Sequence, residues 1–217
     1  MEISYIGLSC FRIKGKDATV VIDPFGKTVG LQVPVPSRFV ADVLLITHDH
    51  PGHGNISAVG GSPKVVDCPG EYEIKGIGIQ GVAAYHDAEQ GEAQGSITIF
   101  ALEVDGVVVA HLGDLAHALS EEQQERLGSI DVLLVPVGGG NSLSATMAVE
   151  VINQLEPKIV IPMHYKLPEL KINLDDLQHF SSEMGIPNME FVPKLSLGAK
   201  PATEDMKVMF LEARSVS

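Results

Sequence analysis

The stretch Thr47-His48-Asp49-His50-Pro51-Gly52-His53 contains three of the eight histidines in the sequence. It directly follows the apolar run 41–46 (ADVLLI), which predicts a buried strand. Residues two apart in an extended backbone point the same way, so His48 and His50 are expected to face one metal ion. Pro51-Gly52 then turns the chain and brings His53 round from another side. Imidazole is the commonest metal-ligating side chain, so we predict a metal site here rather than a solvated loop that happens to be rich in histidine.

Length and charge limit the classes of function. The 217 residues are enough for one large domain with a substantial core, and we predict a single domain over residues 1–217. Fifteen basic and twenty-eight acidic residues give a net charge of −13, which argues against nucleic acid or an anionic membrane as a partner. A small-molecule substrate, even an anionic one, is compatible with this charge because a bound metal reverses the local field.

The sequence also predicts where the protein works. No apolar run approaches the roughly 18 residues of a membrane span, and the start, Met1–Tyr5, lacks the basic and apolar segments of a signal peptide. Cys10 and Cys68 are expected to be buried thiols rather than a disulfide framework. We therefore predict a cytoplasmic protein, and the sequence leaves its oligomeric state open.

Strand patterns dominate the first half of the chain, and strand–helix units follow. A capping box at Ser120 predicts a helix over 121–127, helical spacing predicts another over 145–155, and Asn173 is expected to begin a third that runs to about Met184. One last strand is predicted over 207–211. This order favours an α+β fold in which helices cover the outer faces of two stacked sheets.

Three further polar residues, His86, Asp114 and His164, each follow a predicted strand directly. Taken singly, each has an ordinary explanation as a packed or surface residue. If the strand ends gather at one edge of the sheets, these residues meet the early histidines there. Five imidazoles and one carboxylate are enough for two metal ions, with Asp114 as a bridge.

At this point the sequence resembles the metallo-β-lactamase-fold superfamily, and specifically its branch of uncharacterised zinc-dependent hydrolases that includes lactonase-like members. The matching stretches run in the family's order from the N-terminus to about residue 165: Ile22-Asp23-Pro24-Phe25, Thr47–His53, Pro69-Gly70-Glu71-Tyr72-Glu73, Tyr85-His86-Asp87, His111-Leu112-Gly113-Asp114-Leu115, Pro136-Val137-Gly138-Gly139 and Ile161-Pro162-Met163-His164-Tyr165.

The resemblance implies an αββα sandwich with the site at the sheet edge. It also implies a first metal held by His48, His50 and His86. A second metal would be held by His53 and His164, with Asp114 bridging the two. The implied cofactor is one or two zinc ions, with manganese or iron as alternatives.

One position departs from the family pattern His-X-His-X-Asp-His, because Gly52 stands where the family has Asp. That Asp normally ligates the second metal and helps to position the attacking water. Asp49 is adjacent but is expected to point away from His48 and His50. We therefore predict a weakened second metal site.

The leading hypothesis for function is a metal-dependent hydrolase that uses a metal-bound hydroxide on a small ester, lactone or phosphoester. One alternative is a metal-binding protein of the same fold with a degenerate second site and little catalysis. Another is a phosphodiesterase or nuclease, which the net charge disfavours. A redox di-iron role would need a flavin partner that nothing in the sequence indicates.

The catalytic candidates are Asp114 and His117; His117 is a proton shuttle or substrate anchor, or else the cap of a turn. Asp23 either orients a ligand histidine or is a turn residue before Pro24. Gly138-Gly139-Gly140 resembles a phosphate cradle only loosely and is expected to be a loop that lines the site. Lesser candidates, each with a structural alternative, are Glu71, Tyr72, His111, Tyr165, Lys166 and His179.

Overall fold

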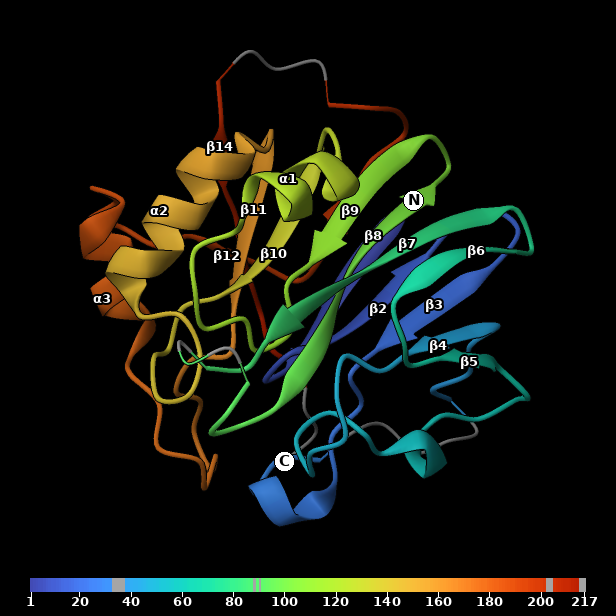
Figure 1. Ribbon diagram of the computed structural model, residues 1–217, viewed down its shortest axis with the longest axis horizontal. Coiled ribbons are helices and arrows are strands. Elements are labelled where there is room, and N and C mark those ends of the chain that lie inside the picture. Colours follow the sequence, from blue (N-terminus) through green and yellow to red (C-terminus); the bar gives the residue numbers. More distant parts are fainter. Residues whose placement is uncertain (33–37, 88, 90, 202–204, 215–217) are drawn as a thin grey trace.

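The computed structural model describes residues 1–32, 38–87, 89, 91–201 and 205–214. Two mixed β-sheets stack face to face, as predicted (Figure 1). The first sheet has the order β13-β1-β2-β3-β4-β5. Its strands are β1 (Glu2–Gly7), β2 (Cys10–Lys14), β3 (Thr19–Ile22), β4 (Val43–Leu45), β5 (Lys64–Val66) and β13 (Leu195–Ser196). The predicted antiparallel meander forms β1 to β3, and β4 then adds parallel to β3.

The second sheet has the order β14-β11-β10-β9-β8-β7-β6. Its strands are β6 (Gly70–Ile74), β7 (Ile77–Tyr85), β8 (Ser96–Val104), β9 (Val107–His111), β10 (Val132–Pro136), β11 (Ile159–Met163) and β14 (Lys207–Val208). Strands β6 to β9 pair antiparallel, whereas β9, β10 and β11 run parallel to one another. The carboxyl ends of these three strands therefore lie at one edge of the sheet.

Alternating strands supply the core between the sheets. Ile3, Tyr5, Phe11 and Ile13 of the first sheet are fully buried and belong to one cluster with residues of the second sheet, such as Leu102. Burying each such side chain contributes roughly 1.5–3 kcal/mol, so this interface fixes the register of the strands that carry the site.

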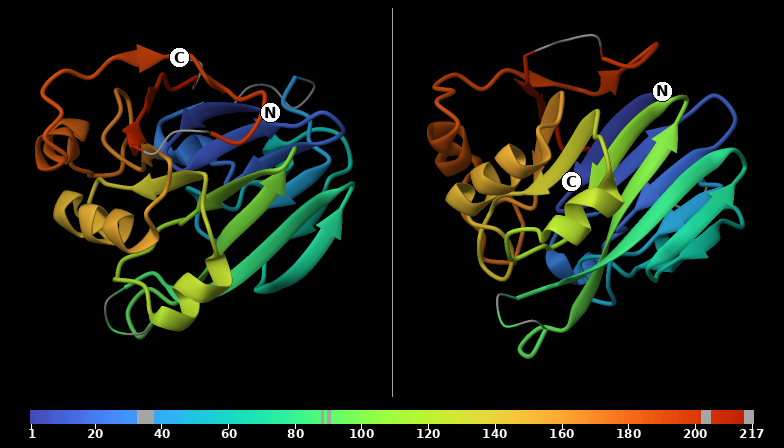
Figure 2. Two further views of the ribbon diagram at one scale, coloured as in Figure 1. Left: turned by 90° about the horizontal axis from the view of Figure 1, so that it is seen from above. Right: turned by 45° about the horizontal axis from the view of Figure 1, so that its top comes forward.

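The three α-helices of the described chain lie on the side of the second sheet (Figure 2). They are α1 (Glu121–Leu127), α2 (Ala145–Leu155) and α3 (Leu177–Glu183). The capping box predicted at Ser120 is present, with Gln123 as its partner. None of these helices is long enough to cross a lipid bilayer.

The outer face of the first sheet is covered mainly by loops. The short 3-10 helices η1 (Lys27–Val29) and η2 (Ile56–Ala58) lie in these segments. A second apolar cluster joins this sheet face to the loops, and it includes Leu8, Leu44, Phe39 and Leu174. The α+β sandwich is thus as predicted, but loops take the place of helices on this face.

Two element boundaries differ from the predictions. The helix expected from Asn173 begins only after Asp176, because the preceding loop is held elsewhere: Lys166 N donates to Asp175 O, and Asp175 N donates to Gly138 O. The single strand predicted over 207–211 is two strands. β14 pairs with β11, and β15 (Phe210–Leu211) pairs with β12 (Phe191–Val192) in a small third sheet. Cys10 is buried as expected, whereas Cys68 is exposed and free.

Candidate metal centre

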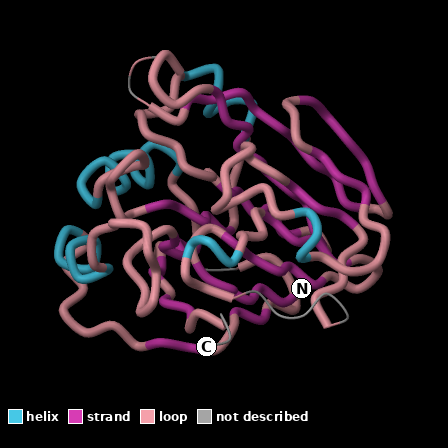
Figure 3. Tube along the Cα trace, turned by 90° about the horizontal axis from the view of Figure 1, so that it is seen from below, coloured by secondary structure: helices cyan, strands magenta, loops and turns pink. Residues whose placement is uncertain are grey.

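Four strands end at the same edge and each is followed by predicted ligands. β4 leads into His48, β7 into His86, β9 into Asp114, and β11 into His164. In Figure 1 the loops after β4 and β11 reach the lower part of the molecule, near the blue η1 segment. Seen from below, loops and short helices lie there together with strands (Figure 3).

Two glycines allow these strand ends to approach closely. Gly113, with φ of +54°, lies against Thr47, and a Cβ built at Gly113 would meet the Thr47 side chain at 2.9 Å. A Cβ at Gly138 would meet the carbonyl oxygen of His164 at 2.2 Å. Any larger residue at either position would push apart the loops that carry Asp114 and His164.

The carboxylate of Asp114 lies at the centre of the imidazoles. The distances from its Oδ2 to histidine Nε2 atoms are 3.1 Å for His53, 3.3 Å for His164, 3.7 Å for His86 and 3.9 Å for His48. Two ligand atoms that each lie about 2.1 Å from one tetrahedral ion are about 3.4 Å apart. The spacing around Asp114 is therefore that of a shared ligand set.

The remaining predicted ligand, His50, belongs to the same cluster. One ligand atom from each of His48, His50 and His86 lies within 4.8 Å of the others, and the same holds for His48, His53 and Asp114. These two groups overlap at His48. The structure therefore brings together all six predicted ligands; their role as ligands stays a prediction.

One buried nitrogen in this cluster lacks a hydrogen-bond partner. His48 Nε2 is one of two such side-chain atoms in the described chain, the other being Arg12 Nε. An unsatisfied buried polar atom costs about 1–3 kcal/mol. A metal ion bonded to His48 Nε2 would remove this cost, so the residues present fit a metal centre.

Hydrogen bonds to the other ring nitrogen hold most of these histidines with Nε2 toward Asp114. His53 Nδ1 lies 2.8 Å from Asp23 Oδ2, and His86 Nδ1 donates to the carbonyl oxygen of Asn141 at 3.0 Å. Ser142 Oγ lies 3.2 Å from His164 Nδ1. Outer partners of this kind fix ring orientation in metal sites.

Asp23 is therefore more than a turn residue. Its carboxylate is fully buried and accepts hydrogen bonds from Thr47 N at 2.8 Å and Thr47 Oγ1 at 2.7 Å, besides its contact with His53. Of the two roles that the sequence left open, the structure supports orientation of a ligand histidine.

The charges of the cluster are strongly coupled. Burial alone would raise the pKa of Asp114, but the imidazoles of His164 and His53 outweigh it and hold this pKa well below its usual range. Burial, reinforced by His53, lowers the pKa of His48 to about 3. Burial would also lower the pKa of His53, yet Asp114 and Asp23 outweigh it and raise that pKa to about 10. The ionised carboxylate and the neutral His48 can accept a cation directly, whereas His53 has to lose a proton first.

A cavity of about 470 Å³ opens onto the cluster, large enough for a small ligand. Its walls include residues that the sequence did not indicate for the site, namely Thr28, Val29, Asn141, Lys171, Ile172, Asn173 and Leu174. Most of them lie on loops without a recognisable motif, so only the folded structure identifies them. Gly140 also lines the cavity, in agreement with the role expected for Gly138-Gly139-Gly140.

Gly52 lies in the cavity wall, and the space beside it is apolar. A Cβ at position 52 would lie 3.0 Å from Leu8 Cδ2 and 4.0 Å from Ile172 Cδ1. The metal-ligating Asp of the family pattern is therefore absent, and a methyl group of Leu8 would crowd the Cβ of any side chain at position 52.

His117 is not brought to the cluster. It lines a different cavity with Tyr85 and Arg126, where its Nε2 accepts a hydrogen bond from Tyr85 N at 3.1 Å. Its Nδ1 lies 2.8 Å from Ala118 O, which fits the alternative role in a turn. A contact of His117 with the reacting atoms is therefore not supported.

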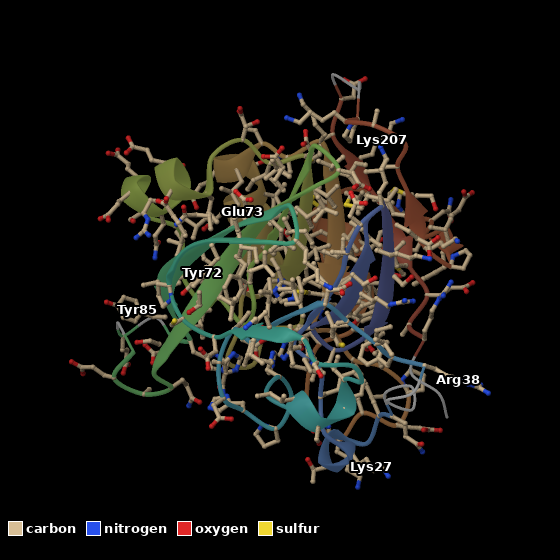
Figure 4. All side chains as sticks on the ribbon, turned by 90° about the vertical axis from the view of Figure 1, so that its right-hand side faces the viewer. Lys27, Arg38, Tyr72, Glu73, Tyr85 and Lys207 are labelled. Carbon is tan, nitrogen blue, oxygen red and sulfur yellow. The ribbon has the colours of Figure 1, made fainter. Side chains whose placement is uncertain are left out.

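The other lesser candidates do not line the metal cavity either. His111 is buried, with Nε2 donating to Ser9 O at 2.8 Å, as expected of a core residue. Tyr72 lies on the edge strand β6 (Figure 4). The others outside the cavity lining are Glu71, Tyr165, Lys166 and His179.

Comparison with known proteins identifies the family. The model of the beta-lactamase superfamily domain matches residues 2–164. A solved structure from Thermotoga maritima, named as a candidate zinc-dependent hydrolase of the metallo-beta-lactamase superfamily, is 36% identical with a TM-score of 0.79. The match covers 97% of this chain and 99% of that one. The chain belongs to the metallo-β-lactamase superfamily.

Two further proteins that this chain resembles are less similar in sequence. A curated metal-dependent hydrolase of Pyrococcus abyssi is 28% identical over 191 residues, covering 76% of this chain and 84% of that protein. The di-iron β-hydroxylase CmlA of Streptomyces venezuelae has a TM-score of 0.63 at 17% identity, over 86% of this chain and 50% of that one. That likeness concerns the fold alone, so the chemistry of this chain has to be argued from its own site.

Proposed function

We propose that this chain is a metal-dependent hydrolase that acts on a small ester, lactone or phosphoester. The observation that carries the proposal is the unpartnered, buried Nε2 of His48 within a cluster of five imidazoles and one carboxylate. The other five residues of this cluster line the cavity. The names of the relatives from Thermotoga maritima and Pyrococcus abyssi point the same way.

In the proposed site, His48, His50 and His86 would hold one ion, His53 and His164 would hold a second, and Asp114 would be a ligand shared by the two. A bound divalent cation supplies Lewis acidity and lowers the pKa of water to about 7. The protein's own contribution is to keep these ligands oriented and largely buried. Asn141 and Asn173 lie in the cavity wall, where their amide groups can bind a polar substrate group.

Lys171 is the only cationic side chain, apart from the histidines, among the described residues that line the cavity. Its backbone is fixed, because Lys171 N donates to Val29 O at 2.8 Å and Gly30 packs closely against Glu169. This placement favours substrates that carry, or release, a carboxylate or phosphate group.

Zinc is the proposed metal, because an imidazole-rich set with one carboxylate suits zinc; manganese and iron remain alternatives. We also propose a cytoplasmic protein with a small-molecule substrate, and the two free cysteines support a reducing compartment. The net charge of −13 still disfavours nucleic acid as a substrate.

A second candidate function is metal binding with little catalysis, and Gly52 is the observation that favours it. With no carboxylate at position 52, the second ion would have His53, His164 and the shared Asp114 as its only predicted ligands.

The test is hydrolysis of a panel of aryl esters, lactones and aryl phosphodiesters by protein loaded with zinc or manganese. We expect turnover that His48→Ala reduces at least 100-fold, while His179→Ala, an exposed histidine on α3, leaves turnover unchanged. Metal bound without turnover of any substrate class would favour the second candidate, and full activity of His48→Ala would assign the turnover to a contaminant.

A further inference from the structure

The turn between β1 and β2, residues 7–9, passes directly beneath the metal-ligand cluster. Leu8, with φ of +54°, uses its carbonyl oxygen to accept hydrogen bonds from His164 N at 2.7 Å and from Tyr5 Oη at 2.9 Å. The carbonyl oxygen of Ser9 accepts a hydrogen bond from His111 Nε2. This turn is thus tied to the ends of both β9 and β11, which carry ligands.

The Ser9 side chain makes the contact that bears on the metal centre. Ser9 is fully buried, and its Oγ donates to Asp114 Oδ1 at 3.3 Å. The other carboxylate oxygen, Oδ2, is the one that faces the four imidazoles. Among the described residues, Ser9 is the only hydrogen-bond donor to Asp114 Oδ1, and the imidazole contacts are all to Oδ2.

Asp114 is more important in this chain than in the family pattern, because Gly52 offers no second carboxylate. The Nε2 atoms of the cluster have no other carboxylate within 4.0 Å in the described part of the chain, and Asp23 contacts the opposite nitrogen of His53. If the Asp114 carboxylate rotated away, neither predicted metal position would keep an anionic ligand from the described residues.

We infer that Ser9 is a positioning residue of the metal centre: its hydroxyl holds the Asp114 carboxylate so that Oδ2 stays directed at the imidazoles. The inference rests on the proposed metal site but not on the proposed hydrolysis. Loss of a partner of this kind typically lowers metal affinity about 10- to 100-fold.

A purely structural role for Ser9 predicts something different. Ser9→Ala would then lower the stability of the metal-free protein and leave metal affinity unchanged. Ser181 is the matched control, because it is a fully buried serine like Ser9. Its hydroxyl donates to the backbone carbonyl of Ile186, in a different part of the fold.

The experiment measures zinc affinity by competition with a chromophoric chelator, and the visible spectrum of the cobalt-substituted protein, for the wild type, Ser9→Ala and Ser181→Ala. We expect Ser9→Ala to weaken binding of at least one equivalent 10-fold or more and to alter the cobalt spectrum. Ser181→Ala should match the wild type in both readouts even where its melting temperature falls.

Ser9→Cys provides a second variant of similar size with a much weaker donor, in case Ser9→Ala does not fold. Its zinc affinity should also fall. Wild-type affinity and an unchanged cobalt spectrum in either folded variant would overturn the role of Ser9. If the wild type binds metal but hydrolyses nothing, the proposed function fails while this inference stands.

Discussion

At the residue scale, the metal centre depends on one buried nitrogen without a hydrogen-bond partner, His48 Nε2, and on the imidazoles gathered around Asp114 Oδ2. The sequence predicted the six candidate ligands, because each follows a strand and the first three share a recognisable spacing. Ser9, Asn141 and Lys171 were missed, since a single serine, asparagine or lysine in a loop has no distinguishing pattern until the fold brings it to the cavity. His117 was selected for its nearness to Asp114 in sequence, but the two side chains point into different cavities.

The raised pKa of His53 predicts that metal binding releases a proton. In the metal-free protein the ring is protonated below pH about 10, because Asp114 and Asp23 outweigh the effect of burial. An ion at Nε2 must displace that proton, so affinity at this position should rise with pH up to about 10 and fall as the pH falls. Calorimetric zinc titrations at pH 7.5 in two non-coordinating buffers of different ionisation enthalpy measure this release. Binding of the second zinc ion should release about one proton. A binding enthalpy independent of the buffer would contradict this.

Lys171 is predicted to select anionic substrates. Lys171→Gln should lower kcat/KM for an aryl ester with a free carboxylate about fivefold, because an exposed ion pair contributes up to about 1 kcal/mol. The corresponding neutral ester should be unaffected. Lys166→Gln is the control, since Lys166 is exposed, lies 4.0 Å from Asp176 and does not line the cavity. Equal losses for both esters in Lys171→Gln would contradict a role in selectivity.

At the element scale, strands with strong alternation were predicted well, and the errors concern segments held by distant contacts. The helix expected from Asn173 starts late because Asp175 bonds to the loop at Gly138, which local sequence does not reveal. The strand over 207–211 divides because residues two positions apart pair with different partners, β11 and β12. The sequence also did not predict that loops cover the outer face of the first sheet, because the apolar residues of these loops have no regular period.

The contact between the β1–β2 turn and the loop after β4 predicts that a single substitution does not restore the missing ligand. Gly52→Asp should bind no more zinc than the wild type and should be less stable, because its Cβ lies 3.0 Å from the buried Leu8. Combining it with Leu8→Ala should make room for the carboxylate and tighten the second equivalent. Zinc content after dialysis measures this.

Leu8→Ala alone is the control for the double variant, and it should lose about 2–5 kcal/mol of unfolding free energy without a gain in zinc. A tightly held second equivalent in Gly52→Asp alone would show that the Leu8 side chain yields readily.

At the scale of the whole molecule, the parallel strands β9, β10 and β11 and the packed sheets bring residues from 48 to 164 to one edge. The sequence predicted this convergence because strand ends and polar residues coincide four times. It did not predict the cavity walls or the close approach of Leu8 to Gly52, because both depend on how loops from the two sheets pack together.

The most direct test is the anomalous difference map of a crystal soaked in zinc, recorded at the zinc absorption edge. We expect a peak about 2.0–2.1 Å from nitrogen atoms of His48, His50 and His86. A fully soaked crystal with no peak among these three histidines, or with zinc only at a surface position such as Cys68, would contradict the metal centre and the function built on it.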